Sequence, residues 1–167
     1  MGNWLAKKQA DKMNEREFSD KYIKEKPMFK AWGEFVLSEI LKKLPDSFHK
    51  YIKIEQIRVK DLDSILNKAF VIKNRKYDEI TDKVGMRFVV LLVDHISDIK
   101  KVIDDELDLW SASEDRELED WRRTNTPDSF GYQSVHYILY AKKDVEHDGV
   151  LIRTGTPCEV QIRTLLQ

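Results

Sequence analysis

Apolar and polar side chains alternate at every second position in three segments of the chain, residues 54–60, 131–140 and 157–164. This alternation is typical of β-strands that bury one face and expose the other. Residues 88–93 are apolar without interruption, as in a central strand that is buried on both faces. A shorter strand is predicted over residues 107–112. The pattern therefore predicts a sheet of roughly five strands.

Apolar residues recur at three- to four-residue spacing in the first third of the chain, which is the helical period. The stripe consists of Phe29, Trp32, Val36, Ile40 and Leu44. We expect Pro27 to open this amphipathic helix and Pro45 to end it, because proline fits a first helical turn and cannot continue a helix. The charged residues 3–23 predict a separate surface helix before it.

Two shorter helices are expected between the strands. Asp61 or Asp63 is placed to cap one that runs to about residue 74. Asp94 is placed to cap another over residues 95–106.

This order of strands and helices predicts an α+β fold, with a mixed sheet of roughly five strands flanked by helices. The 167 residues suffice for one domain with a substantial core. We expect N-terminal helices over residues 1–50 to pack on a core formed by residues 51–167.

Composition narrows the function classes. The formal net charge of −1 gives no global basic field of the kind that drives non-specific nucleic-acid binding. One cysteine excludes an internal disulfide and, with four scattered histidines, argues against a structural zinc site. The sequence has no apolar run of membrane-spanning length and no signal-peptide pattern. We expect a cytoplasmic protein without a membrane partner.

Two of the predicted strands carry chemically unusual polar faces. On the first these residues are Tyr132, Ser134 and His136, and on the second Glu159, Gln161 and Arg163. An aromatic ring, a hydroxyl, an imidazole, a carboxylate, an amide and a guanidinium can together bind a nucleotide and a metal ion. Either face alone is more simply an exposed sheet surface, but two in succession favour a site.

Cationic residues gather where the strand at 54–60 meets the following helix. Arg58 and Lys60 lie on one strand face, and Ser64 and Lys68 lie on one side of the helix. The helix N-terminus adds its own partial positive charge, so this arrangement suits a polyphosphate. A solvated basic edge is the alternative interpretation.

Two carboxylates, Asp82 and Glu159, fall at the entry of one predicted strand and within another. Carboxylates on neighbouring strands are suited to holding Mg²⁺ in nucleotidyl and phosphoryl transferases. Gly85 leaves room for the close approach of a ligand or a neighbouring chain. Because the chain has no glycine-rich phosphate loop of the Walker type, side chains must hold any triphosphate.

Four motifs in this order resemble the synthetase domain of the RelA/SpoT-type alarmone synthetases. The first two are R-x-K-x-x-x-S-I-x-x-K, matched over residues 58–68, and D-x-x-G-x-R, matched over residues 82–87. The other two are G-Y-[QR]-S-[LIV]-H, at residues 131–136, and E-[IV]-Q-I-R-T, at residues 159–164. The resemblance implies a nucleotidyltransferase-like fold. It also implies transfer of pyrophosphate from ATP to the 3′-hydroxyl of GTP or GDP in stringent-response signalling.

The resemblance also implies roles for individual residues. ATP would be bound by Arg58, Lys60, Ser64, Lys68 and Arg87. Mg²⁺ would be held by the catalytic residues Asp82 and Glu159, of which Glu159 is also placed to act as a general base. Tyr132 would stack on the acceptor base, and the acceptor side would be lined by His136, Gln161 and Arg163.

The sequence departs from the family pattern before the third motif. A Pro-Lys pair of the family is replaced here by Pro127 and Asp128, so a lysine for the acceptor phosphate is missing or is replaced by Arg122 or Arg123. Residues 117–120 resemble the acidic version of a family motif found in synthetase-only enzymes, and this resemblance favours GTP over GDP as acceptor.

Two further expectations concern the rest of the chain. The hydrolase activity of the family depends on a His-Asp doublet within a separate helical metal-binding domain. Here His147 and Asp148 stand beside Gly149 in a predicted exposed turn, so we expect a synthetase without hydrolase activity. Residues 165–167 are too few for the helix that follows the fourth motif in the family. We therefore expect a fragment of a longer protein, with apolar surface that favours a homo-oligomer.

Other functions stay open on the sequence. The same fold could pyrophosphorylate another 3′-hydroxyl, on an adenosine nucleotide or at the 3′ end of a tRNA, although the near-neutral charge disfavours tRNA. A catalytically silent nucleotide-binding module is a third interpretation. The two candidate metal-binding carboxylates argue against it, because a pure binder does not need them.

Overall fold

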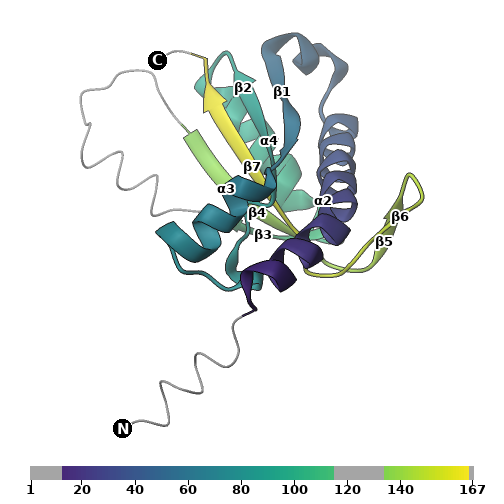
Figure 1. The fold of residues 1–167 in the computed structure, drawn as a ribbon. Helices are drawn as coiled ribbons and strands as arrows, with labels where there is room; N and C mark the ends of the chain where they lie inside the picture. The colour runs from purple at the N-terminus through teal and green to yellow at the C-terminus, as the bar shows by residue number, and fades with distance from the viewer. Residues whose placement is uncertain (1–12, 115–133, 166–167) are drawn as a thin grey trace, which may run out of the picture.

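The computed structural model describes residues 13–114 and 134–165. It contains a five-stranded sheet in the order β1-β2-β7-β4-β3 (Figure 1). The strands are β1 (Ile52–Val59), β2 (Val84–Val90), β3 (Trp110–Glu114), β4 (Ser134–Ala141) and β7 (Pro157–Thr164). Strands β2 and β7 pair in parallel, and the other neighbours pair antiparallel. The predicted α+β fold with a mixed sheet flanked by helices is confirmed.

Two helices, α2 (Glu15–Lys43) and α4 (Val93–Asp105), pack on one face of the sheet. The buried residues of β7 point to this face, in the alternation predicted from the sequence: Cys158, Val160 and Ile162. Tight packing is possible because α2 carries Gly33 at the contact. A Cβ atom there would lie 2.9 Å from the side chains of both Ile57 and Val84. The helix therefore approaches the sheet more closely than any larger residue would allow.

Helix α2 corrects the prediction that Pro27 opens a helix. The helix begins at Glu15, where Asn14 accepts a hydrogen bond from the Glu17 amide, and it runs through Pro27 without a break. The apolar stripe continues across the proline, from the buried Phe18 to residues further along the helix. Pro27 and Ile23 are both exposed, so the carbonyl that loses its helical partner can bind water instead. Burial of the stripe outweighs the local cost of the proline.

The remaining helical segments are short. Helix α3 (Leu62–Leu66) continues into a π-helical turn, η2 (Asn67–Ile72), and lies against α2. The short 3₁₀ segments are η1 (Asp46–Tyr51) and η3 (Tyr77–Glu79). Asp61 caps α3, as expected, by accepting a hydrogen bond from the Ser64 amide at 2.8 Å.

Three boundaries differ from the sequence predictions. The apolar run at 88–93 outlasts its strand, because β2 ends at Val90 and the residues from Leu91 to Val93 are largely exposed. Helix α4 begins at Val93, so Asp94 lies in its first turn and does not cap it. Strand β3 begins at Trp110, three residues after the predicted start, because the buried Trp110 indole anchors it through a hydrogen bond to the Ile103 carbonyl at 2.9 Å.

A separate hairpin, β5 (Val145–His147) and β6 (Val150–Ile152), turns at Asp148 and Gly149, both at positive φ. His147 was predicted to lie in an exposed turn, but it ends β5 and packs edge-on against Phe35. Within the described residues, no helix is both long and apolar enough to span a membrane.

Candidate active site

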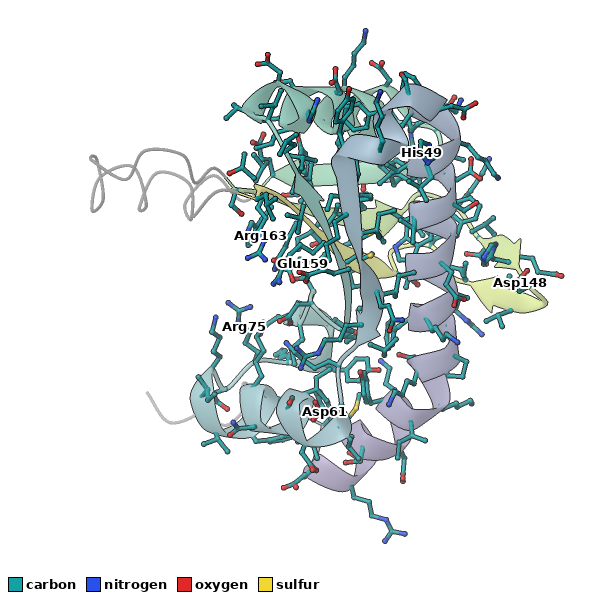
Figure 2. All side chains as sticks on the ribbon, turned by 90° about the horizontal axis from the view of Figure 1, so that it is seen from above. His49, Asp61, Arg75, Asp148, Glu159 and Arg163 are labelled. Atoms are coloured by element: carbon teal, nitrogen blue, oxygen red, sulfur yellow. The ribbon has the colours of Figure 1, made fainter. Side chains whose placement is uncertain are left out.

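A cavity of about 250 Å³ opens on the face of the sheet opposite α2 and α4, over β1, β2 and β7. It is lined by Glu55, Gln56, Arg58, Lys60, Asp82, Gly85, Met86, Arg87, Glu159 and Gln161. Most of the residues that the sequence assigned to ATP and metal binding therefore share one wall. Figure 2 shows Glu159 and Arg163 projecting from β7 on this side.

Two lysines converge on one carboxylate at the edge of this cavity. Lys60 follows β1, and Lys68 lies in the π-helical turn after α3. The ammonium groups of both donate to Oδ2 of Asp82, which stands two residues before β2. Strand, helix and loop thus bring together three charges that are far apart in the sequence. The predicted convergence of Lys60 and Lys68 is present in the structure.

The Asp82 carboxylate is held in its ionised form. Burial alone would raise the pKa of Asp82, but the hydrogen bonds and positive charges of Lys60 and Lys68 outweigh it and leave the pKa below its ordinary value. Oδ1 of Asp82 is buried and has no hydrogen-bond partner among the described residues. A buried carboxylate oxygen without a partner is unfavourable, so this atom is free to bind a cation.

The second carboxylate lies across the parallel pair of strands. Glu159 on β7 pairs in register with Gly85 on β2. A Cβ atom on Gly85 would lie 3.3 Å from the Glu159 carbonyl oxygen and 3.6 Å from its Oε2. The missing side chain leaves the Glu159 carboxylate open toward the cavity. The negative charge of Asp82 is close enough to act on the pKa of Glu159.

The interaction with His136 is the main cause that lowers the pKa of Glu159. Nδ1 of His136 lies 3.7 Å from Oε1 of Glu159, an ion-pair distance longer than a hydrogen bond. The interaction with His136 holds the pKa of Glu159 below its ordinary value, although burial and Asp82 act in the opposite direction. The other ring nitrogen of His136 shares a 3.0 Å hydrogen bond with the Ser134 hydroxyl, which fixes the ring. Glu159 is therefore an ionised carboxylate in a defined orientation.

A network of arginines lines the rest of the face. Arg87 donates to Gln161 at 3.0 Å and to Glu55 at 2.8 Å. Arg163 lies 3.5 Å from the other oxygen of Glu55, and the Nε of Arg163 is buried without a hydrogen-bond partner among the described residues. Glu55 thus joins the residues assigned to ATP with those assigned to the acceptor.

Sequence reasoning missed Glu55 because strict alternation along the strand puts Arg58 and Lys60 on one face and Glu55 on the other. The register between β1 and β2 shifts between Glu55 and Arg58, where β1 has one residue more than its partner. This bulge puts Glu55 and Arg58 on the same side of the sheet. An insertion of this kind leaves no signal in a period-two pattern, so only the pairing partner reveals it.

Two assigned residues are placed differently. The Ser64 hydroxyl donates to Oδ2 of Asp61 at 2.9 Å and does not line the cavity, so it takes part in capping α3. Tyr132 lies outside the described residues, as do Arg122, Arg123 and the acidic residues 117–120.

A divalent cation fits the pair of carboxylates. Asp82 and Glu159 are both ionised, both line the cavity, and Asp82 offers a buried oxygen without a partner. Oxygen ligands of this type suit Mg²⁺, which keeps several waters and needs only one or two carboxylates besides substrate phosphates. The predicted Mg²⁺ site therefore remains a consistent hypothesis.

A group with metal-binding atoms also occurs on the hairpin side of α2. Glu34, His147 and Asp148 each place one such atom within 4.8 Å of the others. Asp148 is exposed at the hairpin tip, away from Glu159 (Figure 2). Solvent-exposed acidic groups of this kind occur commonly without a metal, so we assign no function to them.

Solved structures share this fold. Small alarmone synthetase 1 from Bacillus subtilis matches with a TM-score of 0.60 at 20% identity, over 87% of this chain and 72% of that one. The same synthetase bound to its product pppGpp matches with a TM-score of 0.59 at 19% identity, over 87% and 73%. Protein smu.1046c from Streptococcus mutans UA159 matches with a TM-score of 0.57 at 26% identity, over 92% and 72%.

None of the curated proteins compared with this chain matches it significantly. The family model described as a region found in RelA / SpoT proteins matches residues 57–167, which is most of the chain and includes all four motifs. The resemblance inferred from those motifs is thereby confirmed. The chain belongs to the RelA/SpoT family.

Proposed function

We propose that the chain transfers pyrophosphate from ATP to the 3′-hydroxyl of a guanosine nucleotide, GTP or GDP. The observation that carries this proposal is the convergence of Lys60, Lys68 and Asp82 beside Glu159 on one wall of a cavity. Family membership, and pppGpp as the product of the Bacillus subtilis synthetase, support the same reaction. Its product is guanosine penta- or tetraphosphate, a stringent-response signal made in the cytoplasm.

The reaction exchanges a phosphoanhydride bond for a phosphate ester bond. The 3′-oxygen forms a bond to the β-phosphorus of ATP, and the bond from that phosphorus to the oxygen bridging the α-phosphate breaks. AMP leaves with the electron pair, and the acceptor hydroxyl releases its proton. Such transfers depend mainly on positioning and on neutralising the charge of the phosphates. The cavity must therefore supply cations and a precise orientation for both nucleotides.

Cations surround the place where the ATP phosphates would lie. Lys60 and Lys68 neutralise Asp82 in the free protein and can share their remaining N–H donors with phosphate oxygens. Arg58 lines the same cavity from the end of β1, and Arg87 is held in place by Glu55. Ser64 can contribute to phosphate binding if its hydroxyl turns away from Asp61.

The two carboxylates would hold Mg²⁺, which supplies further positive charge to the transferring phosphates. The lowered pKa of Glu159 keeps this side chain ionised at neutral pH, as a metal ligand must be. The same low pKa makes it a weak base, so its role toward the acceptor hydroxyl is to accept a hydrogen bond and orient it. His136 maintains that orientation.

The acceptor nucleotide would be bound by the neighbouring part of the same sheet face. His136 on β4 pairs in register with Gln161 on β7, and Ser134 pairs with Arg163. Of these groups Ser134 is buried, whereas His136, Gln161 and Arg163 are half-buried and can contact a ribose or a phosphate. We assign the stacking contact with the acceptor base to Tyr132 on its motif alone.

The experiment is to incubate the chain with labelled ATP, Mg²⁺ and one acceptor at a time, and to separate the products by chromatography. We expect a labelled guanosine polyphosphate together with equimolar AMP, and neither with the Asp82→Asn variant. A product formed only with adenosine nucleotides or with tRNA would replace the acceptor in this proposal. Tight ATP binding without transfer to any acceptor would show a silent nucleotide-binding module.

A further inference from the structure

Lys83 is a buried cation that the proposed reaction does not use. It is 3% exposed, and no described residue accepts a hydrogen bond or forms an ion pair with its ammonium group. The ammonium lies over two aromatic rings, 4.3 Å from the centre of Tyr77 and 5.4 Å from that of Phe29. Because burying a charge without a hydrogen-bonding partner is strongly unfavourable, an ammonium group in this position favours water or an anionic ligand as a partner.

The ammonium borders a cavity of about 300 Å³ between α2, η3 and the loop that joins β6 to β7. The cavity is lined by Lys21, Glu25, Met28, Phe29, Tyr77, Asp78, Lys83, Tyr140, Arg153, Thr154, Gly155, Thr156 and Pro157. Asp82 lines the candidate active site, whereas its neighbour Lys83 lines this second cavity. The two cavities therefore lie on opposite sides of one backbone segment and share no lining residue.

The carboxylates of this cavity are already engaged. Glu25 accepts a 2.7 Å hydrogen bond from the Tyr77 hydroxyl. Asp78 is largely exposed and lies 3.7 Å from the ammonium of Lys21. Neither Lys83 nor Arg153 forms an ion pair within 4 Å with a carboxylate of the described residues, although Arg153 contributes, after the hydrogen bonds from Thr154, to the lowered pKa of Asp144. Two positive charges thus remain available at one cavity.

The loop that carries Arg153 is well ordered by hydrogen bonds. The amide and the hydroxyl of Thr156 both donate to the Arg153 carbonyl, at 3.1 and 2.6 Å. Gly155 adopts a φ of +83° and donates to the Ala141 carbonyl at 2.7 Å. A Cβ atom at Gly155 would meet no other atom within 4 Å, so this side of the loop is open. Arg153 is therefore presented at the rim by a fixed turn.

Packing of the lysine on the aromatic rings is the simplest alternative to a ligand. Cation–π contacts compensate for only part of the lost hydration of an ammonium group. In agreement with this, burial lowers the pKa of Lys83 to about 8, although the nearby Asp78 and Glu25 act to raise it and only Lys21 assists the lowering. The aromatic rings and these carboxylates therefore compensate the charge of Lys83 only in part.

We propose that this second cavity binds a phosphate group between Lys83 and Arg153, either as inorganic phosphate or as the phosphate end of a small metabolite. A tetrahedral dianion matches two unpaired cations in charge, and it can accept hydrogen bonds from both. The volume of the cavity also admits a few carbon atoms beyond the phosphate.

Equilibrium dialysis with labelled inorganic phosphate tests this site, with ribose 5-phosphate as the competing sugar phosphate. In Lys83→Met and Arg153→Ala the affinity should fall at least about tenfold, as expected for a lost charge-assisted contact. Lys101→Met, an exposed lysine on α4, is the matched control and should not change it. Lys68→Met distinguishes the two sites: the binding that depends on Lys83 and Arg153 should persist in it, because Lys68 contacts Asp82 at the candidate active site.

Each outcome decides the proposal. If ribose 5-phosphate displaces the labelled phosphate at a concentration at least about tenfold lower than unlabelled inorganic phosphate does, the ligand is a metabolite. If the two compounds displace it at equal concentrations, the ligand is inorganic phosphate. The proposal is overturned if neither compound binds up to about 10 mM, or if binding is lost in Lys68→Met and kept in Arg153→Ala. Arg153 is exposed, so its variant should fold and keep the test valid even if Lys83→Met does not.

Discussion

Replacing Lys83 with methionine should make the fold more stable at neutral pH. Burial lowers the pKa of Lys83 to about 8 in the folded chain, against an ordinary value of 10.5. The folded protein therefore binds this proton less tightly than the unfolded chain does. At about 1.4 kcal/mol per pKa unit, the difference corresponds to about 3 kcal/mol of destabilisation whenever Lys83 is protonated.

Methionine keeps the length and the apolar stem of lysine and places a sulfur atom against the same rings. The variant loses the cation–π contacts with Tyr77 and Phe29, which contribute about 1–2 kcal/mol. The free energy of unfolding should therefore rise by about 1–2 kcal/mol at pH 7.

The pH dependence has a defined sign. Because the pKa of this lysine is lower in the folded state, the unfolded chain binds more protons between about pH 8 and 10.5. The stability contributed by the wild-type residue therefore rises with pH across that window. The difference between variant and wild type should be full below pH 8 and should shrink toward pH 10.5.

Urea unfolding at about pH 7, 8.5 and 10, in buffers free of phosphate, measures this difference. Lys101→Met is again the control, since it removes an exposed lysine that should have no effect of this kind. A Lys83→Met variant that is less stable than wild type at pH 7 would refute the reasoning. A stability difference that does not change with pH would do the same.

Three further predictions concern the site and the long helix. Asp82→Asn and Glu159→Gln should each reduce pyrophosphate transfer by at least about 3 kcal/mol of transition-state stabilisation, measured as kcat/KM, while circular dichroism and melting show an intact fold. Near-wild-type turnover in either variant with Mg²⁺ would contradict the metal assignment. Gly85→Ala should lower the rate, because a Cβ atom there would lie 3.3 Å from the carbonyl oxygen of Glu159, closer than most Cβ contacts, and would displace this residue from its position in the site; an unchanged rate would show that this approach is irrelevant. Pro27→Ala should stabilise the fold by about 1–2 kcal/mol in thermal or urea unfolding, because it restores a helical N–H toward the exposed carbonyl of Ile23; no gain would show that water or helix geometry already compensates.

The burial pattern of the strands was predictable because side chains on one face of a sheet must alternate. Glu159 and Gln161 were expected opposite Cys158 and Val160, and the structure has them so. The same alternation failed on β1, where a bulge moves Glu55 into the site. The pattern records which side chains are apolar. An inserted residue reverses the direction in which the following side chains point, but it leaves no mark in the apolar and polar composition of the strand.

Tertiary contacts explain the other differences. The sequence predicted that Lys60 and Lys68 lie near a phosphate site. It did not predict that both contact the Asp82 carboxylate, because that contact joins three separate elements. Considered alone, Pro27 predicts the start of a helix. The helix instead continues through Pro27, because apolar residues are buried on both sides of it. Lys83 occupies a variable position within the second motif, and only its surroundings distinguish it from a surface lysine.

The position of β7 has a consequence for the order in which the molecule forms. This strand follows the other four along the chain yet lies between β2 and β4, so without it the sheet divides into two unconnected pairs (Figure 1). Its pairing with β2 closes a long stretch of chain, which makes it a slow, late step with a high contact order. A ribosome-bound chain that has not yet released β7 therefore holds Asp82 without Glu159. The proposed activity could begin only when synthesis has passed this strand, which would keep nascent chains from consuming ATP.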